Sequence, residues 1–459
     1  MKFIGREEEI SQINRALSSN QLECIVVYGR RHIGKTELIK HCAMNDTGES
    51  FYYMCREIRE KQQIDGLTQV LSGSVDLGGT YYRSFEDILR YFFVRGEKNK
   101  TVLILDEYPN ARKMIQGLDS ILQALIDEYK HTSNLKLILS GSYIDIMKSI
   151  KESNSPLFGR ITMTIDLRQM NYYDASKFYP SFSDEDKVML YSVFGGMPLY
   201  NSLIDKNISA KENIINLIAS KNARLQDEID FFLRTELSKL DNANSVFDAL
   251  ASGNNKYNQI LEASDINSTA SLRDILVKLC DMEVIKKEYP INKENDKSKS
   301  KYYINDNLAL FYFKYIAKNS SQLEIMNPKV FYDKYIEKDL HEHFIPKAFE
   351  NICKEYLIKE NKAGRIDPVI TKIGKYYYDD AVEHKNGEFD IVSEDDNGYI
   401  FYEAKYKNQP ITEGIIQKEI EQVNKTNLKS YKYGFFSKSG YTKDINKEVI
   451  KYTLKDLYK

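Results

Sequence analysis

One glycine-rich segment near the start of the chain constrains the fold more than any other feature of the sequence. It reads Gly29-Arg30-Arg31-His32-Ile33-Gly34-Lys35-Thr36 and matches the pattern G-x4-G-K-[ST]. The apolar, β-branched run Cys24–Tyr28 precedes it and indicates a buried strand. Glu37–Lys40 follows and indicates the first turn of a helix. A strand, a glycine-rich turn and a helix in this order predict a phosphate-binding loop in an α/β domain.

The chemistry of this loop predicts that the chain binds ATP together with Mg²⁺. The glycines let the backbone curl, so that its N–H groups point at phosphate oxygens at a helix N-terminus. Lys35 would neutralise charge on the outer phosphates, and Thr36 would offer its hydroxyl to the metal.

Length and charge bound the remaining possibilities. A chain of 459 residues is long enough for about two to four domains. The net charge of -2 excludes a globally basic nucleic-acid-binding protein, although local basic patches stay possible. Five scattered cysteines favour a reducing compartment and argue against zinc. No apolar stretch approaches the roughly 20 residues of a membrane span, and no signal-peptide core is present, so we expect a cytoplasmic protein without a membrane partner.

A second apolar run ends in two carboxylates. Thr101–Leu105 is followed by Asp106 and Glu107, as at the carboxyl edge of a central parallel strand, where ligands of open α/β sheets bind. Asp106 would hold Mg²⁺ through water, and Glu107 would orient and polarise the attacking water. The alternative is a strand that simply ends in an acidic loop.

Two further segments add candidate residues. The strand Leu135–Leu139 ends in Ser140-Gly141-Ser142, where Ser142 could reach the γ-phosphate as a sensor or merely begin a loop. Arg160 follows a glycine, and it could be a surface residue or a finger that reaches the γ-phosphate of a neighbouring subunit. The second reading implies a homo-oligomer.

These motifs together resemble the archaeal-type ATPase family of the AAA+/STAND class. The resemblance rests on Phe3-Ile4-Gly5-Arg6-Glu7, the Gly29–Thr36 loop, Leu105-Asp106-Glu107, Ser140-Gly141-Ser142, Pro156-Leu157-x-Gly159-Arg160 and Gly195-Gly196-Met197-Pro198. It implies a P-loop ATPase core with a parallel sheet over residues 1–166 and a helical lid over residues 167–240, whose last helix would run from Ile229 to Leu240. It also implies that Gly5 and Arg6 lie near the adenine.

Residues 241–305 predict a winged helix-turn-helix. Val246–Leu250, Tyr257–Leu261 and a helix capped by Ser268 are followed by two short strands. A lysine-rich connection, residues 292–300, joins these strands and suits the phosphates of DNA. The alternative is a winged helix used for packing or regulation.

Residues 306–459 contain a predicted hairpin with Asn397-Gly398 as its turn. A two-residue turn there pairs Val392 with Glu403 and Asp390 with Lys405. Asp390, Glu403 and Lys405 then project from one face, because positions two apart share a face of a strand.

This pattern resembles the PD-(D/E)xK nuclease superfamily. The resemblance implies a restriction-endonuclease-like α/β domain in which Asp390 and Glu403 hold Mg²⁺ and Lys405 is catalytic. Members often place a third acid on an upstream helix, here Glu350. The alternative is a salt-bridged hairpin, or a nuclease-like fold kept for binding. We therefore expect an ATPase coupled to DNA binding and Mg²⁺-dependent cleavage, with a nucleotide-switched DNA-binding or signalling regulator as the alternative.

Overall fold

In the computed structural model, the apolar runs of the N-terminal half form one parallel sheet. Its five strands lie in the order β2-β3-β4-β1-β5. The strands are β1 (Glu23–Tyr28), β2 (Glu49–Met54), β3 (Thr101–Asp106), β4 (Leu135–Gly141) and β5 (Met163–Asp166). The predicted strands Cys24–Tyr28, Thr101–Leu105 and Leu135–Leu139 are confirmed, and so is the prediction of an α/β domain with a parallel sheet typical of P-loop ATPases.

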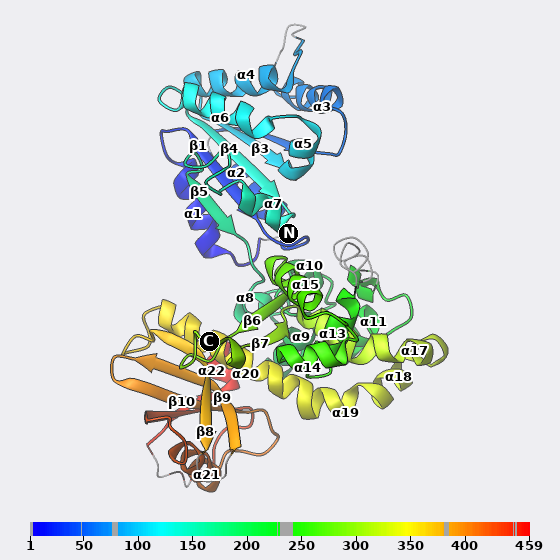
Figure 1. Cartoon of the computed structure of the whole chain (residues 1–459), viewed down its shortest axis with the longest axis vertical. Coiled ribbons are helices and arrows are strands. Elements are labelled where there is room, and N and C mark those ends of the chain that lie inside the picture. Colours follow the sequence, from blue (N-terminus) through cyan, green and yellow to red (C-terminus); the bar gives the residue numbers. More distant parts are fainter. Residues whose placement is uncertain are drawn as a thin grey trace. The chain divides into compact units, whose positions relative to one another are not determined.

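Helices cover both faces of this sheet (Figure 1). Alternate residues of the strands, such as Val26, Leu105 and Leu137, share one core with the helices that lie between β2 and β5. The opposite face carries Ile104 and Asp106, and Thr36 of α2 reaches Asp106 on that side. The helices are α1 (Glu7–Leu17), α2 (Lys35–Met44), α3 (Glu60–Ser72), α4 (Phe85–Lys98), α5 (Tyr108–Met114), α6 (Leu118–Tyr129) and α7 (Ile144–Ser149).

The structure describes residues 3–46, 48–75, 81–226, 228–229, 242–380, 385–443, 445 and 448–459. The chain divides into two compact units, Met1–Gln169 and Met170–Lys459. The predicted domain boundaries at 166/167, 240/241 and 305/306 stay predictions. Most of the predicted helix from Ile229 to Leu240 lies outside the described residues.

The second unit begins with helices and a small hairpin. The helices are α8 (Tyr172–Ser176), α9 (Asp184–Phe194), α10 (Pro198–Ser202), α11 (Ala210–Leu217), α13 (Ala243–Ala251), α14 (Tyr257–Ala263) and α15 (Thr269–Asp281). Ser268 caps α15 by accepting a hydrogen bond from the backbone N–H of Ser271, as the sequence predicts. Strands β6 (Ile285–Glu288) and β7 (Lys301–Ile304) pair antiparallel. Three helices followed by a hairpin are therefore present.

The end of the chain forms a mixed sheet in the order β12-β11-β10-β9-β8. These strands are β8 (Lys372–Asp380), β9 (Lys385–Asp395), β10 (Gly398–Lys405), β11 (Ser430–Ser437) and β12 (Ile450–Thr453). The helices around them are α16 (Asn307–Phe311), α17 (Ser320–Ile325), α18 (Pro328–Tyr335), α19 (Glu337–Asp339), α20 (Ile345–Lys362), α21 (Glu413–Asn424) and α22 (Leu454–Leu457), and π-helical turns occur at Tyr312–Ile316 and Leu340–Phe344.

The predicted register of the β9–β10 hairpin is wrong. Val392 pairs with Phe401 rather than with Glu403, and Gly398 pairs with Asp395, so the turn residues are Asp396 and Asn397. Asp395 accepts a hydrogen bond from the backbone N–H of Asn397, which stabilises the earlier turn. Because the register moves by two residues and side chains alternate with period two, the faces of the strands do not change.

Within the described part of the chain, no helix combines the length and the apolar character that a membrane crossing requires. All five cysteines are free thiols.

Candidate functional site

The phosphate-binding loop joins β1 to α2 and is closely packed. Gly29 has a φ of 155°, and a Cβ there would lie 2.2 Å from the carbonyl oxygen of Leu167, so the position accepts only glycine. His32 (φ 63°) and Gly34 (φ 93°) adopt left-handed conformations that turn the backbone toward the start of α2. The predicted strand, loop and helix are confirmed at these residues.

Lys35 is held in place by the loop itself. Its ammonium group is buried and donates hydrogen bonds to the carbonyl oxygens of Gly29 at 3.0 Å and Arg30 at 3.1 Å. It also donates to Ser142 Oγ at 2.8 Å, across from the end of β4. Arg30 and Ile33 are largely buried, whereas Arg31 is exposed.

The carboxylate of Asp106 meets the start of α2. Thr36 Oγ1 donates to Asp106 Oδ2 at 2.6 Å, and Ser140 donates to Oδ1 in a short hydrogen bond. A hydroxyl and a carboxylate side by side are oxygen ligands of the kind that Mg²⁺ prefers. This donor set fits the magnesium ion that the sequence predicts.

Glu107 is connected to Lys35 through Ser142. Ser142 donates its Oγ–H to Glu107 Oε1 at 2.6 Å and its backbone N–H to Oε2 at 3.2 Å. Glu107 has a φ of 53°, a costly conformation for a residue other than glycine and one that is often found at functional sites. Lys35 and Glu107 thus share one serine hydroxyl.

The opening Gly5-Arg6 segment contacts the same loop. Arg6 is buried and donates from Nη2 to the carbonyl oxygen of Ile33 at 3.3 Å, and it pairs with Glu9 at 3.2 Å. The chain start is therefore anchored to the phosphate-binding loop. The assignment of Gly5 and Arg6 to the adenine stays a prediction.

Arg160 lies at the end of the strands opposite to the phosphate-binding loop. It precedes β5, which begins at Met163, so it is at the amino ends of the parallel strands, whereas the loop is at their carboxyl ends. Its Nη2 and Nε atoms pair with Asp127 of α6 at 2.6 and 3.0 Å, and hydrogen bonding to Arg160 lowers the pKa of Asp127. Arg160 can therefore act only on the nucleotide of another subunit, or else it serves as a surface ion pair.

A comparison of two variants separates these roles of Arg160. If Arg160 is a finger in trans, Arg160→Ala should lower ATP turnover on the order of 10³-fold without weakening ATP binding, because the arginine stabilises transition-state charge. Asp127→Asn should then retain turnover, since it only frees the arginine. Turnover measured against protein concentration should rise as subunits assemble. Equal, small effects of both variants with concentration-independent turnover would assign Arg160 to a surface ion pair.

The second predicted constellation lies on β9, β10 and α20. Because side chains alternate along the hairpin, Asp390, Glu403 and Lys405 still share one face. Glu350 of α20 lies close enough to Asp390 and Glu403 for their charges to interact. The four predicted residues are therefore brought together despite the shifted register.

Lysines neutralise each of these acids. The Lys347 ammonium lies 2.5 Å from Glu350 Oε2 and 2.8 Å from Asp390 Oδ1. Lys405 bonds Glu403 at 2.7 Å and Glu419 of α21 at 2.8 Å. Burial raises the pKa of Glu403 to about 7. Burial opposes ionisation of Asp390 as well, but Lys347 and Lys375 outweigh it and lower the pKa of Asp390.

Two of these carboxylates fit a cation. The oxygens of Glu350 and Asp390 converge on the Lys347 ammonium. Glu403 instead turns to Lys405. Among the described residues, no group of three or more acids, histidines or cysteines converges in this way. A metal ion there would therefore have to displace Lys347.

The lysine-rich connection between β6 and β7 packs against the edge of the C-terminal sheet. The Asn292 side chain bonds both the N–H and the carbonyl oxygen of Tyr377, and the Ile291 N–H donates to the carbonyl oxygen of Lys375. Lys299 donates to Tyr377 Oη at 2.8 Å, and Lys301 pairs with Glu388 at 2.6 Å.

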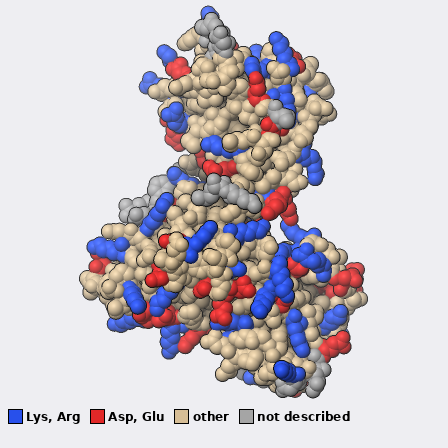
Figure 2. All heavy atoms as spheres, turned by 180° about the vertical axis from the view of Figure 1, so that it is seen from behind, with Lys and Arg blue, Asp and Glu red and all other residues tan. Residues whose placement is uncertain are grey.

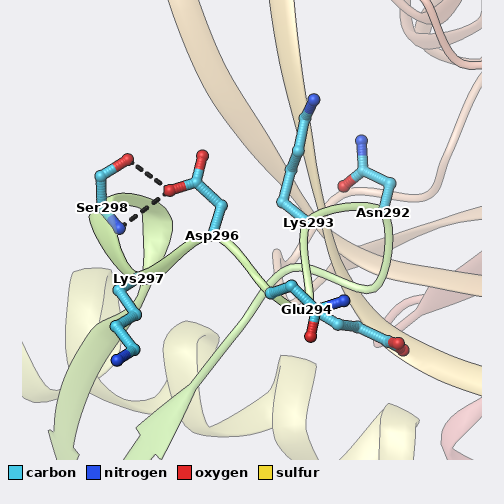
Figure 3. A pocket seen from close by; sticks show the side chains of 7 residues that line it. Asn292, Lys293, Glu294, Asp296, Lys297 and Ser298 are labelled. Carbon is cyan, nitrogen blue, oxygen red and sulfur yellow. Dashed lines mark hydrogen bonds between the residues drawn. The ribbon is translucent and has the colours of Figure 1, made fainter.

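Lys293 and Lys297 remain exposed at this connection, and their side chains extend in different directions (Figure 3). Residues Asn292 to Ser298 line a shallow hollow there. Of the lysines in this connection, Lys293 and Lys297 are therefore available to a phosphate, whereas Lys299 is bonded to Tyr377.

Sequence reasoning missed four residues of these sites: Tyr52, Lys347, Lys375 and Glu419. Tyr52 donates to Asp106, and the other three bind the acids or Lys405. Glu419 lies on the helix that follows Lys405 and faces it, which the helical spacing of α21 could have indicated. The other contacts join distant segments and leave no local pattern in the sequence.

Two family models match parts of the chain. Residues 3–201 match an ATPase domain predominantly from Archaea, and residues 312–423 match a family described as "Archaea bacterial proteins of unknown function". An uncharacterized protein of Methanocaldococcus jannaschii is 29% identical over 409 residues, which cover 88% of each chain. An uncharacterized ATP-binding protein of the same organism is 26% identical over 288 residues, 51% of this chain and 77% of the other.

Among solved structures, the Walker-type ATPase of Pyrococcus abyssi is similar in fold. The TM-score is 0.53 at 17% sequence identity, and the likeness covers 68% of this chain and 96% of that one. It agrees with the parallel sheet described above.

Proposed function

We propose that this chain, which carries an archaeal-type P-loop ATPase domain ahead of a domain of the second matched family, hydrolyses ATP with Mg²⁺ and couples hydrolysis to the binding of DNA. The observation that carries the first part is the network from Lys35 through Ser142 to Glu107, beside the pair Thr36 and Asp106. This network brings together a lysine suited to the phosphates, a carboxylate suited to orienting water, and a hydroxyl and carboxylate suited to Mg²⁺.

Each of these residues would have a separate task. Lys35 would leave the carbonyl oxygens of Gly29 and Arg30 to contact the outer phosphates. Thr36 and Asp106 would hold Mg²⁺, which when bound neutralises charge that develops on the phosphates. Glu107 would accept a hydrogen bond from the attacking water once Ser142 releases one of its oxygens.

DNA binding is supported by the three helices and the hairpin of residues 243–304. Helix α15 exposes Arg273, Val277 and Lys278 on the side away from its buried residues. Basic and acidic residues are interspersed on the face that Figure 2 displays, so a contact with DNA is expected to be local. Lys293 and Lys297 are the exposed lysines of the connection.

We expect the double variant Lys293→Ser/Lys297→Ser to weaken DNA binding. If both lysines contact phosphates, the negative slope of log affinity against log salt should become shallower by about 2. The reason is that roughly 0.9 counterions are released per contact. Fluorescence anisotropy with labelled duplex DNA, with ATP and with ADP, measures both quantities.

The matched control is Lys425→Ser/Lys429→Ser, which removes the same charge from exposed positions after α21. Equal salt slopes for the two double variants would assign the connection to packing. No DNA binding by the wild type in any nucleotide state would favour a signalling regulator.

Metal-dependent cleavage of DNA is a second candidate function. The specific observation in its favour is the convergence of Glu350 and Asp390 on one cation, with Glu403 and Lys405 alongside. Glu350 and Asp390 would hold the ion in place of Lys347, and Glu403 would join them after it leaves Lys405. Lys405 would then stabilise charge on the phosphate.

A further inference from the structure

Tyr52 reaches the ATPase site from the neighbouring strand. β2 pairs with β3, and Met54 stands opposite Asp106. Tyr52 is two residues before Met54, so its side chain leaves the sheet on the same face as that of Asp106. An aromatic side chain is long enough to span such a diagonal pair. The Tyr52 hydroxyl accordingly donates to Asp106 Oδ2 at 2.9 Å.

This hydrogen bond acts on the oxygen that Thr36 also uses. Asp106 Oδ2 accepts from Thr36 Oγ1 at 2.6 Å as well as from Tyr52. The other oxygen, Oδ1, accepts from Ser140 and from the backbone N–H of Glu107 at 3.1 Å. Donors on both oxygens fix the rotation of the carboxylate, and Asp106 is almost fully buried.

The ring of Tyr52 is itself held in place by a contact with α2. The Lys40 ammonium lies 3.9 Å from the centre of the Tyr52 ring, which keeps the ring against α2. The phenol hydroxyl of Tyr52 carries the proton of this hydrogen bond and donates it to the carboxylate.

We propose that Tyr52 is a positioning residue for the magnesium ion of the ATPase site, where it fixes Asp106 in the orientation needed beside Thr36. Groups that orient a metal-binding side chain typically change metal affinity or activity by about 10- to 100-fold when they are removed. The inference rests on the proposed use of Mg²⁺ by Thr36 and Asp106.

The test is Tyr52→Phe, which removes the hydroxyl and keeps the ring over which Lys40 lies. Binding of a fluorescent ATP analogue is measured with a chelator and then along a Mg²⁺ titration. We expect metal-free affinity within about 2-fold of wild type and a half-saturating Mg²⁺ concentration raised by about 10-fold or more. The Mg²⁺ dependence of ATP turnover should move by the same factor.

Tyr53→Phe is the matched control. Tyr53 is the next residue of β2, faces the other side of the sheet and donates to Gln63 at 2.5 Å. Its loss should lower the melting temperature and leave the Mg²⁺ dependence at the wild-type value. A wild-type Mg²⁺ dependence in Tyr52→Phe, or an equal loss of affinity with and without metal, would overturn the role of Tyr52. A wild type that binds nucleotide without any response to Mg²⁺ would instead overturn the proposed magnesium site.

Discussion

Lys35→Ala is expected to abolish ATP binding, whereas Glu107→Gln should bind ATP normally and lose turnover by about 100-fold or more. The two residues share the Ser142 hydroxyl but act on different parts of the reaction. Lys35 would contact phosphate in the bound state, so its loss removes affinity. Glu107 would act on the attacking water, and glutamine keeps its size and its ability to accept from Ser142.

Calorimetric titration with ATP and a phosphate-release assay measure the two effects separately. Lys98→Ala is a suitable control, because Lys98 is an exposed lysine at the end of α4 in the same unit. Its affinity and turnover should match those of the wild type. Equal loss of ATP affinity in Lys35→Ala and Glu107→Gln would be incompatible with these separate roles.

The second large effect concerns the C-terminal acids. If the chain cleaves DNA, Asp390→Asn and Glu403→Gln should each abolish cleavage and weaken the binding of Mg²⁺ or Mn²⁺, because both carboxylates would hold the ion. Lys405→Met should also abolish cleavage but leave metal binding largely intact, since an ammonium group is not a ligand. Lys347→Met should strengthen metal binding, because it removes the cation that Glu350 and Asp390 now share.

Cleavage of labelled duplex and single-stranded DNA, together with calorimetric metal titration, checks these four variants. Asp396→Asn serves as the control, because Asp396 is an exposed residue in the turn of the same hairpin. Activity that survives in Asp390→Asn would place the reaction elsewhere. A wild type that binds no metal and cuts neither DNA form would favour the nucleotide-switched regulator.

The sequence predicted the ATPase core well because its signals are local. A buried strand, a glycine turn and a helix follow one another directly at Cys24–Thr36, and the same holds for the strand that ends at Asp106. Each of these patterns depends on burial and backbone geometry within about ten residues. Tyr52 could not be found in this way, since its role depends on which strand lies beside β3.

The prediction for the C-terminal hairpin was correct in part. The turn signal Asn397-Gly398 misplaced the register, because Asp395 stabilises a turn one residue earlier. The shared face of Asp390, Glu403 and Lys405 survived the error, because an even shift preserves the alternation of side chains. Two of the neutralising lysines, Lys347 of α20 and Lys375 of β8, approach through packing that the spacing of residues in the sequence does not reveal.

The contact of the β6–β7 connection with β8 limits how the chain can be divided. β8 is the edge strand of its sheet, and Ile291 and Asn292 bond its backbone at Lys375 and Tyr377. A fragment that begins at residue 306 would leave these backbone groups without hydrogen-bond partners. An edge strand with unpaired backbone groups can pair with a strand of another copy. Because the connection covers this edge, we expect a C-terminal fragment to stay monomeric only if it retains residues 291 and 292.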